Sequence, residues 1–471
     1  MSGSTVAGPG AGGQLGVGGE PRAAARPAGG SRPWWAGSLP VPTIRTAAAF
    51  VGAAAVSGLG PDMVGVWPPL IVVVLLMVLD AALAPAPWTV GFERQLPAVL
   101  PLDGTGEVVW RVQNPSNRAL RVAFADGLAP SLGATDRRVR TTLPPRGRAR
   151  ARAGLAPRRR GTFRPSAVTI RVVGPLGLAT RQAERQVPGR IEVHPSFRSR
   201  DAAELRIRRA RILQEGLRSV RGRGGGTEFE ALREYVQGDE FRHVDWAATA
   251  RAGAPIVRTY RAERNQTVVV LLDTGRVVAG LVEDVPRLDH GMDATLALAT
   301  VATALGDRVG MIAFGGGVRS VVAPRRDRDQ LRRLSHAMHA LEPELAESGY
   351  HEAFRATLSR FRRRALLVLI TELSDEAVQE TLLPALPVIT REHAVVIASV
   401  RDPALERLRD QEATSASDAY VAAAAASVIS DRTRAAARLR ALGAHVVDAG
   451  PDELASALAD VYLDVKARGR L

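Results

Sequence analysis

The sequence predicts an α/β protein in which a membrane-anchored, β-rich N-terminal half precedes a doubly wound, mostly parallel sheet. Three observations support this fold class. Two apolar segments lie near the N-terminus, short segments rich in β-branched residues follow them, and apolar strands alternate with helices from residue 266 onward. Apolar strands separated by helices are typical of a parallel sheet covered on both faces. At roughly 150 residues per domain, the 471 residues suit two or three domains.

Composition excludes several classes of function. The chain contains no cysteine, which excludes disulfides, thiolate metal sites and cysteine nucleophiles. Its net charge of +15 is carried by arginine, since Lys466 is the one lysine. Because Ala, Gly and Pro are also abundant, the excess charge fits a coding bias as well as a polyanionic partner. We therefore do not expect nucleic acid to be the partner.

Two regions are predicted to extend or connect the folded parts. Residues 1–43 are rich in Gly, Pro and Ala and have little to bury, which predicts a disordered tail. Residues 199–226 are basic, with helical spacing first and glycines at the end, which predicts a helical and then flexible linker. Basic segments close to a membrane can also bind anionic lipid.

Residues 44–86 contain two apolar segments, 46–59 and 66–83, joined by a short turn. The second has the roughly 18 apolar residues that cross a bilayer, interrupted by Asp80. The pair predicts a hairpin of two transmembrane helices in the cell membrane; a hairpin buried in a protein core is the alternative. Arginines flank the pair on both sides and the turn has none, so the positive-inside rule places both termini in the cytoplasm.

Residues 87–198 are predicted to form a β-sandwich-like module. Short segments with partial alternation, such as EVVWRVQN and SAVTIRVVG, are separated by Pro, Gly and Asn turns. Arginine clusters in this region are expected on loops or on exposed strand faces, with binding of lipid or nucleic acid as the alternative.

Residues 266–471 are predicted to form the doubly wound sheet. Four apolar runs, beginning with TVVVLLD, alternate with helical segments, and a further helix, strand and helix follow. Ligands of such sheets bind beyond the carboxyl ends of the strands. The residues expected near those ends are Asp273, Phe314, Thr371 and Glu372.

The segment 227–265 contains an unusual run of charges, ALREYVQGDEFRHVDWAATAR, in which the acids Glu234, Asp239 and Asp245 interleave with three arginines around Trp246. The simplest interpretation is a structural knot that docks the segment onto the α/β domain and presents a rigid surface. Trp246 is expected to stack on the arginines. The residues assigned to this knot are Arg233, Glu234, Tyr235, Gly238, Asp239, Arg242, Asp245, Trp246 and Arg251.

The spacing of the charged residues predicts which of them form ion pairs. Asp239 and Arg242 are three apart, as are Arg242 and Asp245, so each pair would face across one helical turn. Gly238 permits a tight turn, after which Asp239 would cap a helix that runs from Arg242 to Ala250.

A catalytic interpretation of the same segment is the alternative. Asp239 and Asp245 would be paired carboxylates and His243 a general base. However, no serine or cysteine nucleophile stands beside His243, and GRGGG lacks the Lys-Ser/Thr of a phosphate loop. We therefore expect no catalytic residues.

Two histidines, His336 and His339, are three apart on a predicted helix, a spacing at which they could share a metal ion. The two residues between them do not match the metalloprotease pattern, so we expect both histidines to lie on the surface without a metal.

The segment around Trp246 closely resembles the signature of the domain of unknown function 58 family, with Thr249 where a serine is common. Gly161 to Phe163 and the turn from Gly174 to Leu178 also match, with Gly174 where an acid is common. The resemblance implies membrane helices, a β-rich region and a von Willebrand factor type A-like domain, in this order.

The α/β region itself resembles a von Willebrand factor type A domain, in which Asp-x-Ser-x-Ser, with a later Thr and an Asp, holds a divalent cation. Oxygen-only ligands suit Mg²⁺. Here the loop reads Asp273-Thr274-Gly275-Arg276-Val277, and Thr371-Glu372 stands where Thr-Asp is usual. Because two serines are missing and a guanidinium is added, we expect a degenerate loop that holds no metal and no cofactor.

The family resemblance further implies an interaction or adaptor protein that works with a MoxR-type AAA+ ATPase in protein complex assembly or envelope maturation. A transglutaminase-like membrane protein is the second partner that it implies. Two alternatives stay open: a hydrolase using Asp239, Asp245 and Asp273, and a binder of anionic lipid or nucleic acid through the arginine clusters.

Overall fold

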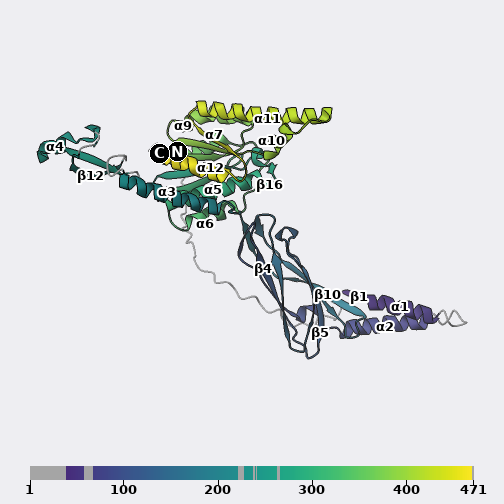
Figure 1. The fold of residues 1–471 in the computed structure, drawn as a ribbon. Helices are drawn as coiled ribbons and strands as arrows, with labels where there is room; N and C mark the ends of the chain where they lie inside the picture. Colours follow the sequence, from purple (N-terminus) through teal and green to yellow (C-terminus); the bar gives the residue numbers. More distant parts are fainter. Residues whose placement is uncertain are drawn as a thin grey trace, which may run out of the picture. The chain divides into compact units, whose positions relative to one another are not determined.

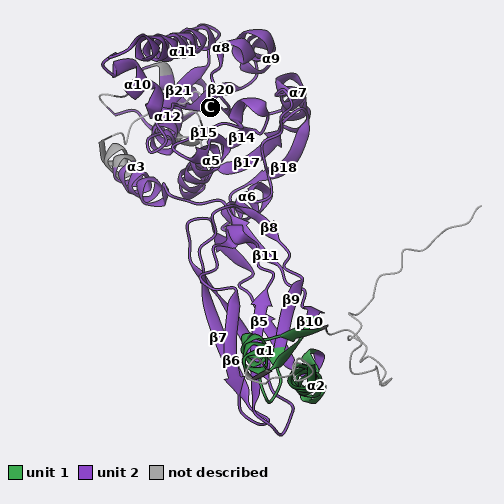
Figure 2. Ribbon diagram, turned by 90° about the vertical axis from the view of Figure 1, so that its right-hand side faces the viewer, with its two compact units in different colours: residues 1–87, 172–183 green, residues 88–171, 184–471 purple. Residues whose placement is uncertain are grey.

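The computed structural model describes residues 39–57, 67–220, 228–236, 239, 241–261 and 266–468. The chain divides into two compact units, residues 1–87 with 172–183 and residues 88–171 with 184–471 (Figure 2). Most of the predicted tail lies outside the described residues. Its last part is ordered, because β1 (Leu39–Pro42) pairs antiparallel with β10 (Ala179–Gln186).

Two helices of the first unit, α1 (Ile44–Ser57) and α2 (Trp67–Leu83), lie side by side (Figure 1). Among the described residues, one helical stretch is apolar and long enough to cross a membrane, the 23 residues Trp67–Thr89 with mean hydropathy 2.4. The 14 residues of α1 extend about 21 Å, short of the roughly 30 Å of a bilayer core. The structure therefore supports one span where the sequence predicted two; the turn between them lies outside the described residues.

Asp80 is fully buried within the first unit although it belongs to the apolar α2. Its carboxylate accepts hydrogen bonds from the backbone N–H groups of Leu176, Leu178 and Ala179 at 2.7, 2.7 and 2.8 Å. A side chain on Gly174 would overlap this carboxylate. The acid that interrupts the apolar segment thus fills the space that an acidic residue at position 174 would take, and it anchors α2 to the turn before β10.

The β-rich module of the second unit is built from short sheets. Strands β2 (Gly91–Gln95), β4 (Gly106–Gln113) and β7 (Arg148–Leu155) form one antiparallel sheet. A second contains β6 (Arg138–Leu143), β5 (Leu120–Asp126) and β9 (Ala167–Val173), and a third has the order β3 (Val99–Pro101), β11 (Ile191–His194), β8 (Gly161–Phe163).

The core of the module contains a buried polar triad. The indole of Trp110 donates to Asp126 at 2.6 Å, and Arg94 pairs with the other oxygen of that carboxylate at 2.5 Å. The arginines of β7, at alternate positions, are exposed, while the alanines between them are partly covered. Strand alternation therefore places this arginine cluster in solvent, as predicted.

The α/β domain has a six-stranded sheet with the order β18-β17-β14-β19-β20-β21. All neighbouring strands are parallel except the edge pair β17 and β18, which is antiparallel. The strands are β14 (Thr267–Asp273), β17 (Arg308–Phe314), β18 (Val318–Arg325), β19 (Leu366–Ile370), β20 (Ala394–Val400) and β21 (His445–Ala449).

Helices cover both faces of this sheet (Figure 1). One face packs against α5 (Arg287–Ala304), α6 (Gln330–Met338) and α12 (Leu454–Ala467), and the other against α7 (Tyr350–Arg360), α9 (Leu383–Thr390) and α11 (Ala416–Ala441), with α10 (Pro403–Asp410) beside α11. Successive residues of β14 enter the two cores in turn, which explains why the strand is apolar at every position.

The predicted linker begins as part of this domain. Helix α3 (Arg200–Val220) buries Ala203 in the core beside α5 and α12, and Arg206 pairs with Asp460 at 2.8 Å. The prediction of a linker was therefore wrong for the first turns of α3, because its small apolar residues cover a helix pair.

Candidate functional site

The signature segment folds as a small hairpin. Strand β12 (Glu228–Glu234) pairs antiparallel with β13 (Ile256–Arg261), and between them lie a 3₁₀ turn, η4 (Phe241–His243), and a short helix, α4 (Trp246–Ala252). We call these elements the signature hairpin. Antiparallel pairing brings residues far apart in sequence into contact, which decides its ion pairs.

The first ion pair joins Arg233 and Asp239. Two guanidinium nitrogens of Arg233 donate to the two carboxylate oxygens at 2.8 and 2.7 Å, and the backbone N–H of Val236 adds a third bond at 2.9 Å. The Asp239 side chain is 2% exposed, and its carboxylate raises the pKa of Arg233. This bidentate fork closes the turn after β12.

The second ion pair joins Asp245 and Arg258. Asp245 is the N-cap of α4, accepting from the backbone N–H of Ala248 at 3.0 Å, while Arg258 donates to its other oxygen at 2.8 Å. These bonds lower the pKa of Asp245, the backbone bond most strongly. The predicted cap at Asp239 was wrong: Asp239 is held by Arg233, and the helix begins at Trp246.

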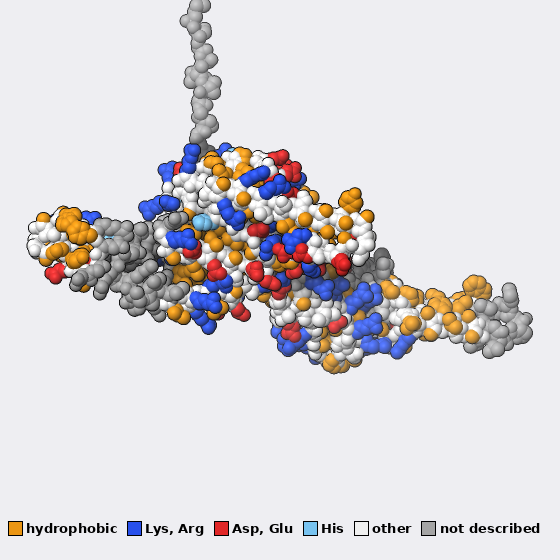
Figure 3. All heavy atoms as spheres, turned by 45° about the horizontal axis from the view of Figure 1, so that its top comes forward, with side chains coloured by type: hydrophobic (Ala, Val, Ile, Leu, Met, Phe, Trp, Pro, Cys, Tyr) orange, Lys and Arg blue, Asp and Glu red, His pale blue; other side chains and the backbone are white. Residues whose placement is uncertain are grey.

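Five large apolar side chains of the hairpin are exposed, and we call them the apolar face. The exposed fractions are 69% for Phe241, 62% for Trp246, 47% for Val236, 45% for Leu232 and 38% for Tyr235. Figure 3 shows orange side chains gathered on the described part of this segment, at the left of the view. Phe241 and Trp246 meet edge to face, with ring centroids 5.5 Å apart. Trp246 therefore pairs with an aromatic ring; the predicted stacking on arginine is not seen among the described side chains, which do not include that of Arg242.

The other residues assigned to the knot contribute less. Glu234 and Arg251 are exposed, and Arg233 donates to the carbonyl of Glu234 at 3.0 Å. Gly238 and the side chain of Arg242 lie outside the described part of the chain. The main contacts of the described hairpin elements are with one another, so docking onto the α/β domain stays a prediction.

The second candidate region is the carboxyl edge of the sheet, where Asp273 ends β14. Asp273 is fully buried and accepts bonds from the hydroxyls of Ser348, Thr371 and Tyr350 at 2.7, 2.6 and 3.2 Å. The backbone N–H of Gly275 adds a bond at 2.8 Å. Burial is the largest influence on this carboxyl and raises its pKa. An acid surrounded by neutral donors is thus held at this edge.

Ser348 takes the place of a missing side chain. A Cβ on Gly275 would overlap the Ser348 hydroxyl, so the oxygen expected from a serine in this loop is supplied by the segment that precedes α7. Thr274, by contrast, points away from Asp273 and donates to the carbonyl of Phe314 at 2.8 Å. Sequence reasoning missed Ser348 and Tyr350, because nothing in the local pattern marks a loop 75 residues from Asp273.

Glu372, the other acid predicted at this edge, lies in an arginine clamp. Arg287 donates to one carboxylate oxygen of Glu372 at 2.6 Å, and Arg432 pairs with the other. Arg432 also pairs with Asp448, at 2.7 Å. Burial lowers the pKa of Arg287. Of the degenerate-loop positions, Asp273 and Thr371 are therefore brought together, whereas Thr274 and Glu372 are bonded elsewhere.

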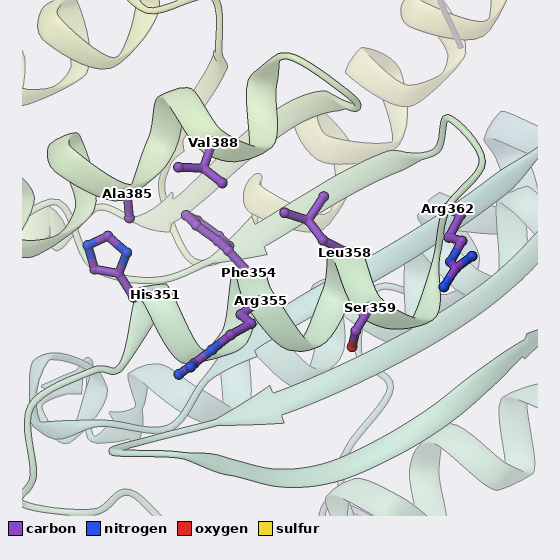
Figure 4. A pocket seen from close by; sticks show the side chains of 8 residues that line it. All are labelled: His351, Phe354, Arg355, Leu358, Ser359, Arg362, Ala385 and Val388. Atoms are coloured by element: carbon purple, nitrogen blue, oxygen red, sulfur yellow. The ribbon is translucent and has the colours of Figure 1, made fainter.

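A shallow groove of about 740 Å³ lies between α7 and α9 (Figure 4). Phe354, Leu358, Ala385 and Val388 form its apolar wall. His351 and Ser359 both line it but lie eight residues apart on α7, about 12 Å along a helix, so they cannot act as a nucleophile and base.

These regions define the class of protein: a doubly wound α/β protein with an apolar N-terminal helix, an ion-paired hairpin, and a sheet edge whose two acids are bonded by its own side chains. Residues 231–442 match the model of the family described as protein of unknown function DUF58.

The curated relatives are uncharacterized. Uncharacterized protein Mb1516 of Mycobacterium bovis and Uncharacterized protein Rv1480 of Mycobacterium tuberculosis are each 26% identical over 208 residues, 44% of this chain. The match spans 63% of the length of those relatives.

Among solved structures, the conserved hypothetical protein BatB of Bacteroides thetaiotaomicron is 15% identical, with TM-score 0.29, covering 44% of this chain and 100% of its own. The CARDB domain of PF1109 from Pyrococcus furiosus is 13% identical, with TM-score 0.15, covering 22% of this chain and 94% of its own.

Proposed function

We propose that this is a membrane-anchored, non-enzymatic interaction protein whose apolar face docks a partner protein. The observation that carries the proposal is that face: five exposed apolar side chains on a hairpin in which Asp239 and Asp245 are held in ion pairs. Clustered exposed apolar groups mark contact surfaces, and Trp and Tyr dominate the binding energy of many interfaces. The fork and the capped helix hold the face in one shape, which lowers the entropy lost on binding.

The partner in this proposal is a MoxR-type AAA+ ATPase, acting in protein complex assembly or envelope maturation, with a transglutaminase-like membrane protein as a second partner. The choice comes from the resemblance to the DUF58 family, whose model matches residues 231–442 and so includes most of the hairpin.

The α/β domain in this proposal is a von Willebrand factor type A-like platform that works without a metal ion, cofactor or catalytic residue at its sheet edge. The bonding of Asp273 supports this: both oxygens accept hydrogen bonds from protein groups. Glu372, which stands where the second acid of that family's site belongs, is neutralised by two guanidinium groups.

The anchor in this proposal is α2 as a single membrane-spanning helix, with the domains that follow it in the cytoplasm. The apolar side chains around α2, such as Ile71 and Leu75, are more than half exposed, which suits contact with lipid. Asp80, the charge within α2, is covered by backbone donors and does not face lipid.

The test is co-purification of the full chain with a MoxR-type ATPase from native membranes, with the ATPase locked in its nucleotide-bound state. We expect Trp246→Ala and Phe241→Ala to abolish capture, because each removes a large part of the apolar face. Tyr420→Ala is the matched control, since Tyr420 is an aromatic residue 80% exposed on α11; it should capture normally.

The same preparation separates the alternatives. Equal capture by Trp246→Ala and the unmodified chain would overturn docking through the hairpin. A polyanion binder would lose binding steeply as salt rises, whereas an apolar contact would keep it. Turnover of a substrate that Asp273→Asn abolishes, in a protein that still folds, would favour a hydrolase.

A further inference from the structure

Three histidines and a glutamate meet where β11 of the β-rich module lies against α6 of the α/β domain. Glu192 and His194 are two apart on β11, so they point to the same side of the strand. His336 lies in the last turn of α6 and His339 is its C-terminal cap, three residues on and on the same side of the helix. One potential ligand atom from each of the four side chains lies within 4.8 Å of all the others.

We propose that Glu192, His194, His336 and His339 form a binding site for a divalent transition-metal ion, with zinc as the preferred ion. Three imidazoles and one carboxylate are ligands that zinc takes, whereas Mg²⁺ prefers oxygen alone. Four protein ligands complete a tetrahedral shell, which is the arrangement of structural sites. The ion would clamp the β-rich module to the α/β domain.

Hydrogen bonds orient the rings for this role. The Nδ1 of His339 contacts the carbonyl oxygen of His336, which only accepts, so Nδ1 carries the proton and Nε2 keeps its lone pair. The Nδ1 of His194 lies 3.0 Å from the Ser335 hydroxyl, which leaves its Nε2 3.2 Å from Glu192. Outer partners of this kind fix histidine rings in metal sites.

The crowding of the rings is explained by a shared ion. The centroids of His336 and His339 are 4.9 Å apart and those of His194 and His339 are 5.2 Å apart, with nearly parallel planes. Glu192 faces both His194 and His336, the latter at 3.3 Å, and Arg190 holds its other oxygen at 2.6 Å. One carboxylate oxygen thus lies between two imidazoles, where a cation would find three ligands.

Access and burial also suit a bound ion. His339 and Glu192 are 7% and 9% exposed, so the expectation of two surface histidines was wrong for His339. The His336 side chain is 60% exposed and provides an entry path from solvent. The hydroxyl of Thr162, on β8, lies 2.9 Å from the Nε2 of His339. When a metal binds, this hydrogen bond would break and the Nε2 lone pair would coordinate the ion.

The test uses the full chain in detergent micelles after treatment with a chelator. Titration with Co²⁺ is expected to give a visible absorption band that saturates at one ion per chain and disappears when Zn²⁺ is added. His336→Gln and His339→Gln should lose the band, and Zn²⁺ should raise the Tm of the unmodified chain but not that of His336→Gln. Ser335→Ala, which removes an outer partner, should weaken zinc binding about 10-fold.

His351→Gln is the matched control, because His351 is an exposed histidine on α7 away from the cluster; its band should be unchanged. If His339→Gln, at a buried position, fails to fold, His336→Gln still decides the test, because the His336 side chain is mostly in solvent. Absence of a saturating band in the unmodified chain, or a band that persists in His336→Gln, would mean that the cluster is a hydrogen-bonded junction without a metal.

Discussion

At the scale of single residues, Asp273 shows how neutral protein groups can bond a buried acid. Its donors are three hydroxyls and one backbone N–H, and Tyr350 and Thr371 also bond each other at 2.8 Å. Burying a carboxylate is costly unless its oxygens are bonded. Each hydroxyl of this network is therefore expected to matter for stability in a way that sequence spacing does not reveal.

We expect Ser348→Ala to destabilise the protein by about 1–3 kcal/mol, because it leaves the buried Asp273 oxygens with a donor missing. Asp273→Asn should cost less, since an amide keeps one acceptor and can donate to hydroxyls, which also accept. Urea unfolding of the purified variants measures both. Ser359→Ala, at an exposed hydroxyl on α7, is the control; equal effects at Ser348 and Ser359 would contradict this account.

The raised pKa of Asp273 makes the free energy of unfolding depend on pH. The folded chain retains this proton to higher pH than the unfolded chain, whose carboxyl has an ordinary pKa of 3.8. The stabilising contribution is present below that value and is lost as pH rises through the folded-state pKa. The free energy of unfolding of Asp273→Asn, relative to the unmodified chain, should therefore increase as pH rises from 3.8. A difference that stays constant with pH would count against the shift.

At the scale of elements, the signature hairpin separates what sequence could predict from what it could not. The acids, arginines and aromatic residues were identified, and the strands and helices of the α/β domain follow their apolar patterns, as β14 does. The pairing was mispredicted because three-residue spacing assumes one continuous helix. The partners Asp245 and Arg258 are 13 residues apart and meet because the residues just before α4 pair antiparallel with β13, at Val244 and Val257.

The same limit applies to the clusters at loops and junctions. His336 and His339 were visible as a pair, but their partners His194 and Glu192 lie more than 140 residues away on another module. Ser348 and Tyr350 likewise reach Asp273 only through the tertiary fold. Local periodicity predicts elements, whereas a site assembled from several loops depends on how those elements pack.

Arg233→Lys should loosen the signature hairpin although it keeps the charge. An ammonium group cannot form the two parallel bonds that Arg233 makes with Asp239. Hydrogen–deuterium exchange should rise at the backbone N–H of Val236, which bonds the same carboxylate, and partner capture should fall with it. Arg251→Lys, at an exposed position on α4, is the control. Unchanged exchange in Arg233→Lys would show that the fork does not hold the turn.

At the scale of the whole molecule, the proposed membrane anchor predicts attachment through α2 and not through the arginine excess. We expect the full chain to remain with membranes after washing in about 1 M salt. At this concentration the Debye length is about 3 Å, so attraction between surface charges is screened. Removal of residues 67–83 should release the protein into the soluble fraction. Release of the full chain by salt alone would instead indicate binding through basic residues to anionic lipid.

The Asp80 carboxylate beneath Gly174 makes these two positions interdependent. Gly174→Asp alone should fail to accumulate, because two carboxylates would compete for one set of backbone donors, and Asp80→Gly should restore it by leaving a single acid in that space. Chimeras that take the anchor helix from a relative with an acid at position 174 would therefore need to exchange the turn as well, because helix and turn share one carboxylate site.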